Sequence, residues 1–570
     1  MPVFWYNLVD EAWMTGRRSD DGPRQVGLLD VLLDADRFED LVMDLPTQIP
    51  AVLRQVLLPV VVDALGAPAD RRDWRQRFAQ GHFSEAERER LRIYLGEHHE
   101  RFDLFSQTFP FGQVAGLRTT KGETKGSATL VANAASGNNV PLFASRTEAD
   151  PLELTPAQAV HWLLHTLCWD TAAIKTGAVD DPQAKAGKTT GNPTGPLGQL
   201  GVVMPVGQTL YETLLLNMPF TPAARLGVPQ WKRPAATPAW TTRAADGLLD
   251  LWTWQSRRVR LIPHDTQDGV RVARVVVSAG DRLSMVPEWE PHTAWNLAPV
   301  GKKGTEKKAA KGHRHPRRHV AGKAAWRGLE AMLTPGRDNN AVETSFLLDQ
   351  IAELQDSGAI PADYPLQVHT YGMIYGTQSA VVEDILCDAI ALPILSLVAD
   401  TDTRDMVLEV AEQAEKLARA VNNLSADLRR AAGADPIPWN EGQRPGELVL
   451  HGLDPLVRRL LAGVRAAGGD EEVLQRGQLA WEKLAWRTTR DVAEKVFATT
   501  PPGAFVGREV KQTKQGKNNE KAVTYSLGTA EHNFLRQLRA VLPRAADART
   551  TEAAARRASD AAQPATMTGA

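Results

Sequence analysis

Two histidines four residues apart are the clearest candidates for metal chemistry in this chain. His161 and His165 lie in the segment His161-Trp-Leu-Leu-His165, and on a helix this spacing puts both rings on one face, as a zinc site requires. The glutamate that would follow the first histidine is missing, and no third ligand stands out. Two interpretations remain open: a metal-dependent hydrolase that uses this pair, or a partly buried helix face.

Other enzyme signatures are incomplete. Gly187-Lys188-Thr189 resembles the end of a phosphate-binding loop, but the first glycine of that motif would fall at Pro182. The sequence contains no Gly-x-Ser-x-Gly nucleophile elbow, and His292 and His313 have no partner that the sequence can suggest. We therefore expect no catalytic residues and a protein that is not an enzyme.

A glycine-bounded segment is a better candidate for contact with a ligand. In Tyr371-Gly-Met-Ile-Tyr-Gly-Thr-Gln-Ser-Ala380, Gly372 and Gly376 bracket a short apolar stretch, and Thr377 and Gln378 follow it. Because glycine adopts backbone angles that other residues avoid, this pattern predicts a tight turn with Gln378 at its tip. An amide can donate and accept hydrogen bonds, but it is neither a nucleophile nor a strong base. A plain surface turn between two core strands is the alternative.

Three long polar loops, at 118–150, 176–201 and 301–323, are expected to carry function or to be disordered. Backbone glycines can approach a DNA groove closely, and isolated Arg or Lys side chains can enter the minor groove. The third loop is the strongest basic run and would contact phosphates without reading the sequence, unless it is only a solvated loop. Its candidate phosphate contacts are Lys302, Lys303, Lys307 and Lys308.

Composition limits the classes of protein that remain. The chain has 570 residues and a net charge of -2, so we expect two or three domains and local basic patches rather than a uniformly basic surface. Two cysteines, Cys168 and Cys387, exclude a disulfide framework and favour a cytoplasmic protein. The longest apolar stretch, Val52 to Leu65, contains Arg54 and Asp63, so it is too charged and too short to span a membrane.

The elements that must position these residues are mixed in the first part of the chain. Phe4 to Trp13 is rich in aromatic and β-branched residues, and Arg271 to Val277 alternates, so both are expected to be strands. Leu154 to Trp169 is a predicted helix with Thr155-Pro156 at its start. The pattern predicts an α+β protein whose large mixed α/β N-terminal domain covers 1–395.

The pattern beyond that domain is helical. Apolar residues step by three and four through the first helix, and three further helical stretches follow at 448–466, 471–497 and 530–542. We predict an all-α four-helix bundle over 396–545, with a lysine-bearing loop at 507–521 and a flexible tail at 546–570. The seam of the first helix is Val407, Val410, Ala414, Leu417, Val421, Leu424 and Leu428.

The order of several segments resembles the CasA family, which provides the large subunit of the type I-E CRISPR Cascade surveillance complex. The resemblance covers roughly residues 3–545, and it depends on an ordered set of segments rather than on one diagnostic motif. These segments are Asn7-Leu-Val-Asp-Glu-Ala-Trp13, Arg101-Phe-Asp-Leu-Phe105, Pro110-Phe-Gly-Gln113, Leu214-Leu-Leu216-Asn217 and Trp289-Glu-Pro-His292.

The resemblance implies a subunit that recognises the protospacer-adjacent motif (PAM) in double-stranded DNA. Such a subunit starts strand separation for R-loop formation and helps recruit a helicase-nuclease in antiviral defence. Its implied partners are the target DNA, the 5′ handle of the guide RNA, and the backbone and small subunits of the complex, with no membrane. A purely structural cap on a ribonucleoprotein particle is the alternative.

The resemblance also assigns roles to residues. The wedge of the family aligns with Thr377 and Gln378, and Phe143 becomes the aromatic anchor of the loop that meets the guide handle and neighbouring subunits. Some relatives carry a cysteine cluster, but 262–269 contains none, so we predict no zinc and no other cofactor. The glycine loop and the basic finger, where arginine replaces the lysine of the family, correspond to Gly191, Asn192, Gly195, Gly198, Arg282 and Arg274.

Overall fold

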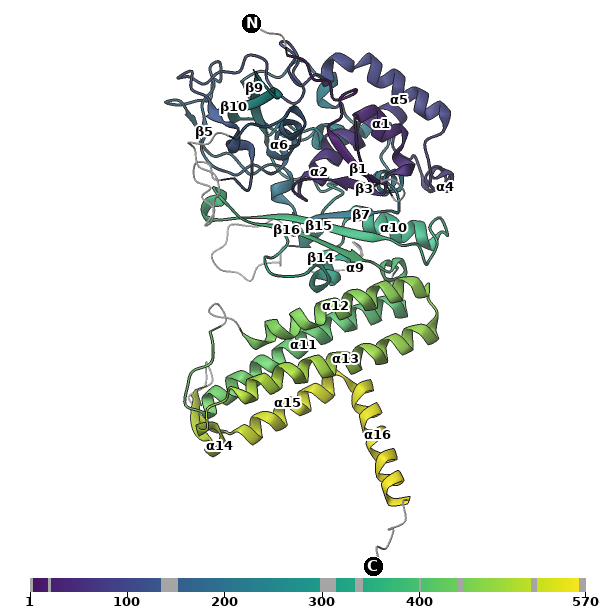
Figure 1. Ribbon diagram of the computed structural model, residues 1–570, viewed down its shortest axis with the longest axis vertical. Helices are drawn as coiled ribbons and strands as arrows, with labels where there is room; N and C mark the ends of the chain where they lie inside the picture. Colours follow the sequence, from purple (N-terminus) through teal and green to yellow (C-terminus); the bar gives the residue numbers. More distant parts are fainter. Residues whose placement is uncertain are drawn as a thin grey trace, which may run out of the picture. The chain divides into compact units, whose positions relative to one another are not determined.

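The computed structural model describes residues 4–18, 22–134, 152–297, 314–333, 342–398, 401–438, 444–513 and 520–562. Mixed helices and strands are followed by a helical region, which confirms the predicted α+β class (Figure 1). The chain divides into two compact units. The first holds most of the chain up to Ile390, and the second holds the chain from Ala391 together with 326–330 and 362–364.

The first unit opens with a three-stranded antiparallel sheet in the order β2-β1-β3. The strand expected at residues 4–13 is wrong, because only Asn7 forms an isolated bridge there, with Asp103. The Asn7 side chain accepts a hydrogen bond from the Val9 backbone N–H at 2.9 Å, which stabilises a turn in place of a strand. The elements are β1 (Met14–Arg18), β2 (Gly22–Val26), α1 (Leu28–Leu33) and β3 (Asp40–Val42).

A continuous helical stretch forms the core of this unit. It consists of α2 (Gln48–Val52), a π-helical turn (Leu53–Leu57) and α3 (Leu58–Leu65). Among the described residues, it alone is long and apolar enough to cross a membrane, with a mean hydropathy of 1.5, but 83% of it is buried in the protein. Inside it, Arg54 forms an ion pair with Glu290 at 2.6 Å. Burial of this kind is typical of a core helix.

The helix that begins at Pro156 is well capped. The Thr155 hydroxyl accepts a hydrogen bond from the Gln158 backbone N–H at 3.2 Å, and the Gln158 side chain accepts one from the Thr155 N–H at 3.1 Å. The predicted helix start is therefore confirmed. The helices before residue 391, besides those above, are α4 (Arg71–Gln80), α5 (Glu85–Glu97), α6 (Pro156–Trp169), α7 (Leu210–Leu216), α8 (Leu248–Trp252), α9 (Leu329–Leu333) and α10 (Phe346–Asp356).

Two sheets frame the region of interest. The long hairpin β9 (Arg257–Thr266) and β10 (Gly269–Ala279) pairs with β4 (Lys125–Gly126), so the strand predicted at 271–277 is confirmed. The second sheet has the order β16-β15-β7, and Tyr371 of β15 lies opposite Val202 of β7. The remaining strands are β7 (Val202–Val206), β15 (Gln367–Tyr375), β16 (Val382–Ala391), β5 (Lys175–Thr176), β6 (Lys188–Thr189), β8 (Thr242–Arg243), β11 (Arg282–Leu283), β12 (Trp295–Leu297), β13 (Arg314–Pro316) and β14 (Val342–Glu343).

The second unit contains four long helices that lie side by side (Figure 1). Every predicted seam residue of the first helix is buried, with no more than 3% of its surface exposed. The heptad-like pattern is therefore confirmed as the packed face of that helix. The four helices are α11 (Asp402–Ala431), α12 (Pro445–Ala467), α13 (Glu471–Ala498) and α15 (Leu527–Val541).

Two segments of this unit differ from expectation. The segment predicted as a loop at 507–521 follows a short α14 (Gly503–Val506), and its described residues belong to the paired strands β17 (Arg508–Thr513) and β18 (Glu520–Tyr525). This strand pair is stabilised where Tyr525 packs with Ala431 and Ala504.

Residues 546–562, expected in a flexible tail, belong to α16 (Pro543–Ala562), which projects away from the other helices in Figure 1. The helix begins with proline, is rich in alanine, and is anchored where buried Glu482 binds Arg544 and the Ala545 N–H.

Candidate nucleic-acid interface

The turn between β15 and β16 presents two polar side chains to solvent. Thr377 and Gln378 are both exposed at its tip. Gln378 and Ser379 have φ values of 56° and 54°, so two consecutive residues with side chains lie in the left-handed region. This backbone is costly for residues other than glycine, and it persists only where the surrounding structure holds it.

The chain around the turn supplies that support. The Gly376 N–H donates to the Val381 carbonyl at 3.0 Å and closes the hairpin. A Cβ at Gly376 would lie 2.8 Å from both the Glu383 carboxyl carbon and the Val381 Cγ2, so a side chain there would displace at least the flexible Glu383. The Ala172 N–H donates to the Ser379 carbonyl at 2.8 Å. The turn is therefore fixed both by its own strands and by the segment that follows α6.

The predicted glycine loop packs against the base of this hairpin. A Cβ at Gly198 would overlap the Tyr375 hydroxyl, and that hydroxyl donates to the Trp169 carbonyl at 2.6 Å. Gly195 lies against the end of α6, where its N–H donates to the Asp170 carbonyl at 2.9 Å. The structure thus brings together two elements that the sequence could not place relative to each other.

Most of the glycine loop faces inward. Gly191 is exposed with φ of 69°, whereas Asn192, Gly195 and Gly198 are buried. A Cβ at Gly195 would lie 2.7 Å from the Trp169 backbone nitrogen. The buried glycines therefore allow close packing of the loop on its own chain, and Gly191 is the predicted loop residue that remains accessible.

Arg282, one of the two residues expected in the basic finger, supports the glycine loop. Its guanidinium donates to the Thr190 carbonyl at 2.6 Å and to the Asn192 side-chain oxygen at 3.2 Å. Its Cζ lies 3.9 Å from the centre of the Trp240 ring. Burial lowers the pKa of this guanidinium, which nevertheless stays charged at neutral pH. Arg282 is half-buried and holds Gly191 and Asn192 in place.

Arg274, the other expected finger residue, lies on a different sheet. It sits in β10 opposite Gly126 of β4. Its side chain is exposed and its Nε donates to the Thr124 hydroxyl at 2.9 Å. The described contacts of Arg274 connect it to 124–126, so the two finger candidates do not form one cluster.

An ionic cluster beneath the turn and the loop was missed by the sequence. The Asp170 carboxylate binds Arg257 and Lys175, each at 2.5 Å. The same arginine donates to the Thr171 and Pro193 carbonyls, each at 2.8 Å. Arg257 thereby joins the segment that contacts the turn to the segment that forms the glycine loop.

The charges in this cluster stabilise one another. Burial alone would raise the pKa of the Asp170 carboxyl, but Lys175 and Arg257 outweigh it and lower that pKa to about 2. Burial lowers the pKa of Lys175 to about 8, because Asp170 offsets it only in part. Asp170 and Arg257 lie 87 residues apart, and neither stands in a recognisable motif, so only a known spatial contact could have identified them.

A cavity of about 250 Å³ lies beside the base of the turn. Met373 and Val382 of the hairpin line it on one side, and Lys125 and Lys175 contribute ammonium groups. Asp170, which also lines the cavity, neutralises Lys175, so the exposed Lys125 supplies the positive charge beside the turn, and this charge suits a polyanion.

The basic run is described only at its end. Phe143, Lys302, Lys303, Lys307 and Lys308 lie outside the described residues. Beyond the run, the Arg318 Nε donates to the Gln199 carbonyl at 3.4 Å, and the His319 ring lies 3.0 Å from the Val202 carbonyl. The segment after the lysines therefore packs where the glycine loop enters β7.

Of the two candidate metal ligands on α6, His165 lies in the core of the first unit and His161 is half-buried. His165 is buried and its Nε2 lies 3.0 Å from the Thr47 hydroxyl, and burial lowers its pKa to about 3. The His161 ring packs on Trp13 with 5.8 Å between ring centres. Within the described ranges, no group of three or more His, Cys, Asp and Glu side chains could hold a metal ion. The geometry favours the helix-face interpretation.

Comparison with known proteins gives a consistent match. The family described as CRISPR-associated protein Cse1 matches residues 7–492. The CRISPR-associated protein CasA/Cse1 of Thermus thermophilus is 28% identical over 508 residues, which are 85% of this chain and 92% of that protein.

Solved structures share the fold over nearly the whole chain. The crystal structure of Thermobifida fusca Cse1 has 31% identity and a TM-score of 0.79, over 95% of this chain and 99% of the other. Cse1 from Acidimicrobium ferrooxidans has 26% identity and a TM-score of 0.76, over 95% and 99%. A chain of a structure titled CRISPR RNA-guided surveillance complex has 20% identity and a TM-score of 0.62, over 87% and 99%, and shows the fold alone.

Proposed function

Because the chain belongs to the CasA/Cse1 family of CRISPR-associated proteins, as the sequence predicted, we propose that it is the large subunit of an RNA-guided surveillance complex and recognises the PAM in double-stranded DNA. In this role it starts strand separation and helps recruit a helicase-nuclease. It acts in the cytoplasm without catalysing a reaction. Its partners are the guide 5′ handle and the other subunits of the complex.

The exposed Thr377–Gln378 tip is the single observation that carries this proposal. A wedge must be narrow, polar enough to meet base edges and rigid enough not to fold back. The left-handed backbone at Gln378 and the bond between Ala172 N–H and Ser379 give the turn that rigidity. Unstacking a base step costs a few kcal/mol, which the new pairing with a guide strand can offset at near balance, as is known for a different RNA-guided effector.

The glycine loop and the basic residues have supporting roles in this proposal. Gly191 and Arg282 offer a small surface and a positive charge next to the turn. The minor groove distinguishes base pairs only coarsely, so shape and charge at this point set which PAM is accepted. Arg274 adds a positive charge on a separate sheet, in β10.

The four lysines of the basic run, Lys302, Lys303, Lys307 and Lys308, are proposed to bind DNA phosphates. Replacing all four by glutamine should reduce the slope of log Kd against log salt by about 0.9 for each phosphate that the protein no longer binds. Binding measured by fluorescence anisotropy between low and moderate salt would test this. An unchanged slope would mean that the run is a solvated loop.

Reconstitution tests the function as a whole. A guide-loaded complex that lacks its large subunit is mixed with target duplexes that carry a permissive or a scrambled PAM, with and without this chain. We expect the chain to restore tight binding on the permissive duplex alone. Equal restoration on both duplexes would instead identify a structural cap or a general DNA clamp.

A further inference from the structure

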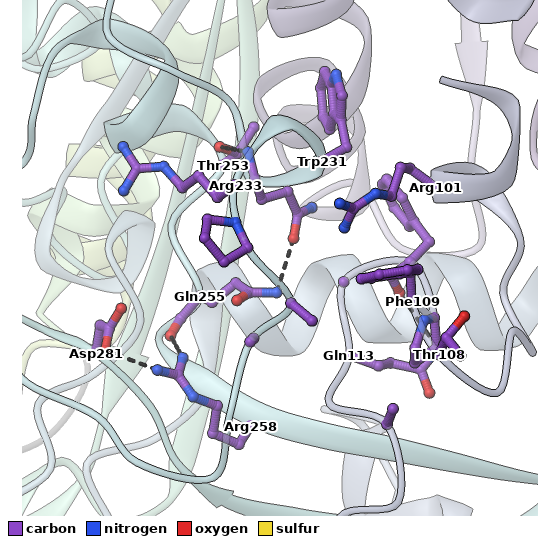
Figure 2. A pocket seen from close by; sticks show the side chains of 18 of the residues that line it. Arg101, Thr108, Phe109, Gln113, Trp231, Arg233, Thr253, Gln255, Arg258 and Asp281 are labelled. Atoms are coloured by element: carbon purple, nitrogen blue, oxygen red, sulfur yellow. Dashed lines mark hydrogen bonds and ion pairs between the residues drawn. The ribbon is translucent and has the colours of Figure 1, made fainter. Parts of the chain in front are cut away.

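A second cavity, of about 220 Å³, is lined by other residues of the first unit. Its walls come from 108–115 and 230–258, and Asp281 closes one side (Figure 2). Arg101 and the segment Pro110-Phe-Gly-Gln113 contribute to it. These are residues of the family-like motifs that the proposed DNA interface leaves without a role.

Both carboxylates in the lining of this pocket already form ion pairs with arginines. Asp250 binds Arg243 at 2.5 Å and Arg233 at 3.1 Å. Asp281 binds Arg258 at 2.9 Å, and Figure 2 shows this pair on the side of the pocket away from Arg101. Because three arginines share two carboxylates, the lining carries an excess of positive charge even before Arg101 is considered.

Arg101 adds a guanidinium that lacks a carboxylate partner among the described residues. Its Cζ lies 3.9 Å from the centre of the Phe109 ring, and that ring is 37% exposed. Figure 2 shows the guanidinium over this ring and directed into the pocket. Stacking fixes the plane of the guanidinium and leaves its N–H edge free, which is the arrangement that binds a planar or tetrahedral anion with two parallel hydrogen bonds.

A second donor in the pocket also lacks an acceptor. Gln255 donates its amide Nε2–H to the Gln230 side-chain oxygen at 2.9 Å. The Gln230 amide nitrogen is buried and, within the part of the chain that the structure describes, has no hydrogen-bond partner. Buried donors are rarely left unpaired. Since Arg101 and Gln230 can only donate through these atoms, the missing group must be rich in acceptor oxygens and negatively charged.

We propose that this pocket binds a single phosphate group of a nucleic-acid strand. Its volume lies below the range of roughly 300–1,000 Å³ that is usual for sites of drug-sized ligands, which suits one group rather than a whole molecule. Asp281 of the pocket directly precedes Arg282, which holds the glycine loop. A strand that contacts that loop therefore lies near the Asp281 edge of this positively charged pocket. A carboxylate shares the acceptor chemistry, so an acidic peptide is the occupant that the test must separate.

The test uses the purified full chain and three small probes: a 5′-phosphorylated thymidine dinucleotide, thymidine, and an acidic tetrapeptide. We expect the dinucleotide to bind in calorimetric titrations and the other two probes to have at least a tenfold higher Kd. A tenfold change in Kd is about what the loss of one charge-assisted hydrogen bond causes. Arg101→Gln should weaken dinucleotide binding about tenfold. Arg101→Lys should recover part of the loss, because it keeps the charge but not the two-pronged geometry.

Arg75 provides the matched control, since it is an exposed arginine on α4 whose replacement by glutamine changes the charge equally. Arg75→Gln should leave the dinucleotide affinity within about twofold. Equal loss in both variants, no effect of Arg101→Gln, or no dinucleotide binding would overturn the proposal. Arg101-dependent binding of the peptide in place of the dinucleotide would also overturn it and would identify a protein contact. No probe contains a PAM, so this result is independent of the reconstitution.

Discussion

At the scale of single residues, backbone geometry gives the Gln378 amide its position. Two left-handed residues in sequence, Gln378 and Ser379, cost of the order of 1–3 kcal/mol each. Two β-strands and the hydrogen bond from Ala172 hold them in that state. An exposed side chain at the end of a rigid hairpin is suited to insert into another molecule.

Replacing Gln378 by alanine should impair duplex opening more than assembly of the complex. We expect the rate of duplex opening, measured by the fluorescence of 2-aminopurine next to the PAM, to fall about tenfold to a hundredfold. This range corresponds to losing part of the few kcal/mol that a wedge contributes to unstacking a base step. Gln76→Ala, which truncates an exposed glutamine on α4, is the control. If the Gln378 variant opened the duplex at the wild-type rate, the turn would not be a wedge.

Asp170 predicts a specific pH dependence of stability. Its pKa is about 2 in the folded chain and 3.8 ordinarily, so its stabilisation is complete above about pH 4 and is lost as pH falls toward 2. The stabilisation that ionised Asp170 contributes to the free energy of unfolding amounts to about 2 kcal/mol. Urea unfolding of Asp170→Asn between pH 2.5 and 7 should therefore show the largest deficit at neutral pH and a shrinking one in acid. A deficit that does not change with pH would contradict the ionic role of Asp170.

At the scale of elements, the hairpin and the glycine loop form one rigid assembly. Gly198 packs on Tyr375, Gly195 packs on the end of α6, and Arg257 binds carbonyls on both sides. Glycine at these positions permits contact between backbone segments that a methyl group would separate. The geometry of the turn therefore depends on residues that never reach the surface.

Gly198→Ala should destabilise the first unit by about 1–3 kcal/mol through overpacking. Tyr375→Phe removes the hydroxyl that the new methyl group would overlap, so the double variant should be less destabilised than the sum of the single ones. Gly96→Ala on α5 serves as the control, since its methyl group would meet no atom within 4 Å and would gain nothing from Tyr375→Phe. Additive free energies of unfolding in both cycles would show that the loop and the hairpin are not in contact.

At the scale of the whole molecule, two compact units have separate cores. In the first, Arg54 of the central helical stretch pairs with the buried Glu290. In the second, Glu482 is fully buried and accepts hydrogen bonds from Arg544 at 2.8 Å and from the Ala545 N–H at 2.9 Å. Each unit thus contains a buried carboxylate whose loss should affect that unit alone.

Calorimetry should resolve two unfolding transitions, because units with separate cores unfold as separate cooperative blocks. Glu482→Gln should destabilise the second unit by about 1–3 kcal/mol, the usual effect of weakening a buried charge-assisted hydrogen bond. Only the unfolding transition of the second unit should move to lower temperature. A single transition that shifts as a whole would mean that the units unfold together.

Local features of the sequence determined much of this protein. The turn at Gly376–Ala380, the start of α6 and the buried seam of α11 follow from backbone preferences, capping and periodicity, which act over a few residues. The family also follows from the order of such segments along the chain. The β17–β18 strand pair and α16 were missed, because packing on Ala431 and Glu482 favours them and local composition does not indicate that packing.

Only the tertiary structure decided which of the candidate residues meet. It placed Gly198 on Tyr375, used Arg282 to hold the glycine loop, put Arg274 on another sheet, and buried the His165 ring beside Thr47. It also joined Asp170 to Arg257 across 87 residues. The reason is physical: the free energy of a buried ion pair or a glycine contact depends on neighbours that are distant in sequence, and no local pattern encodes their approach.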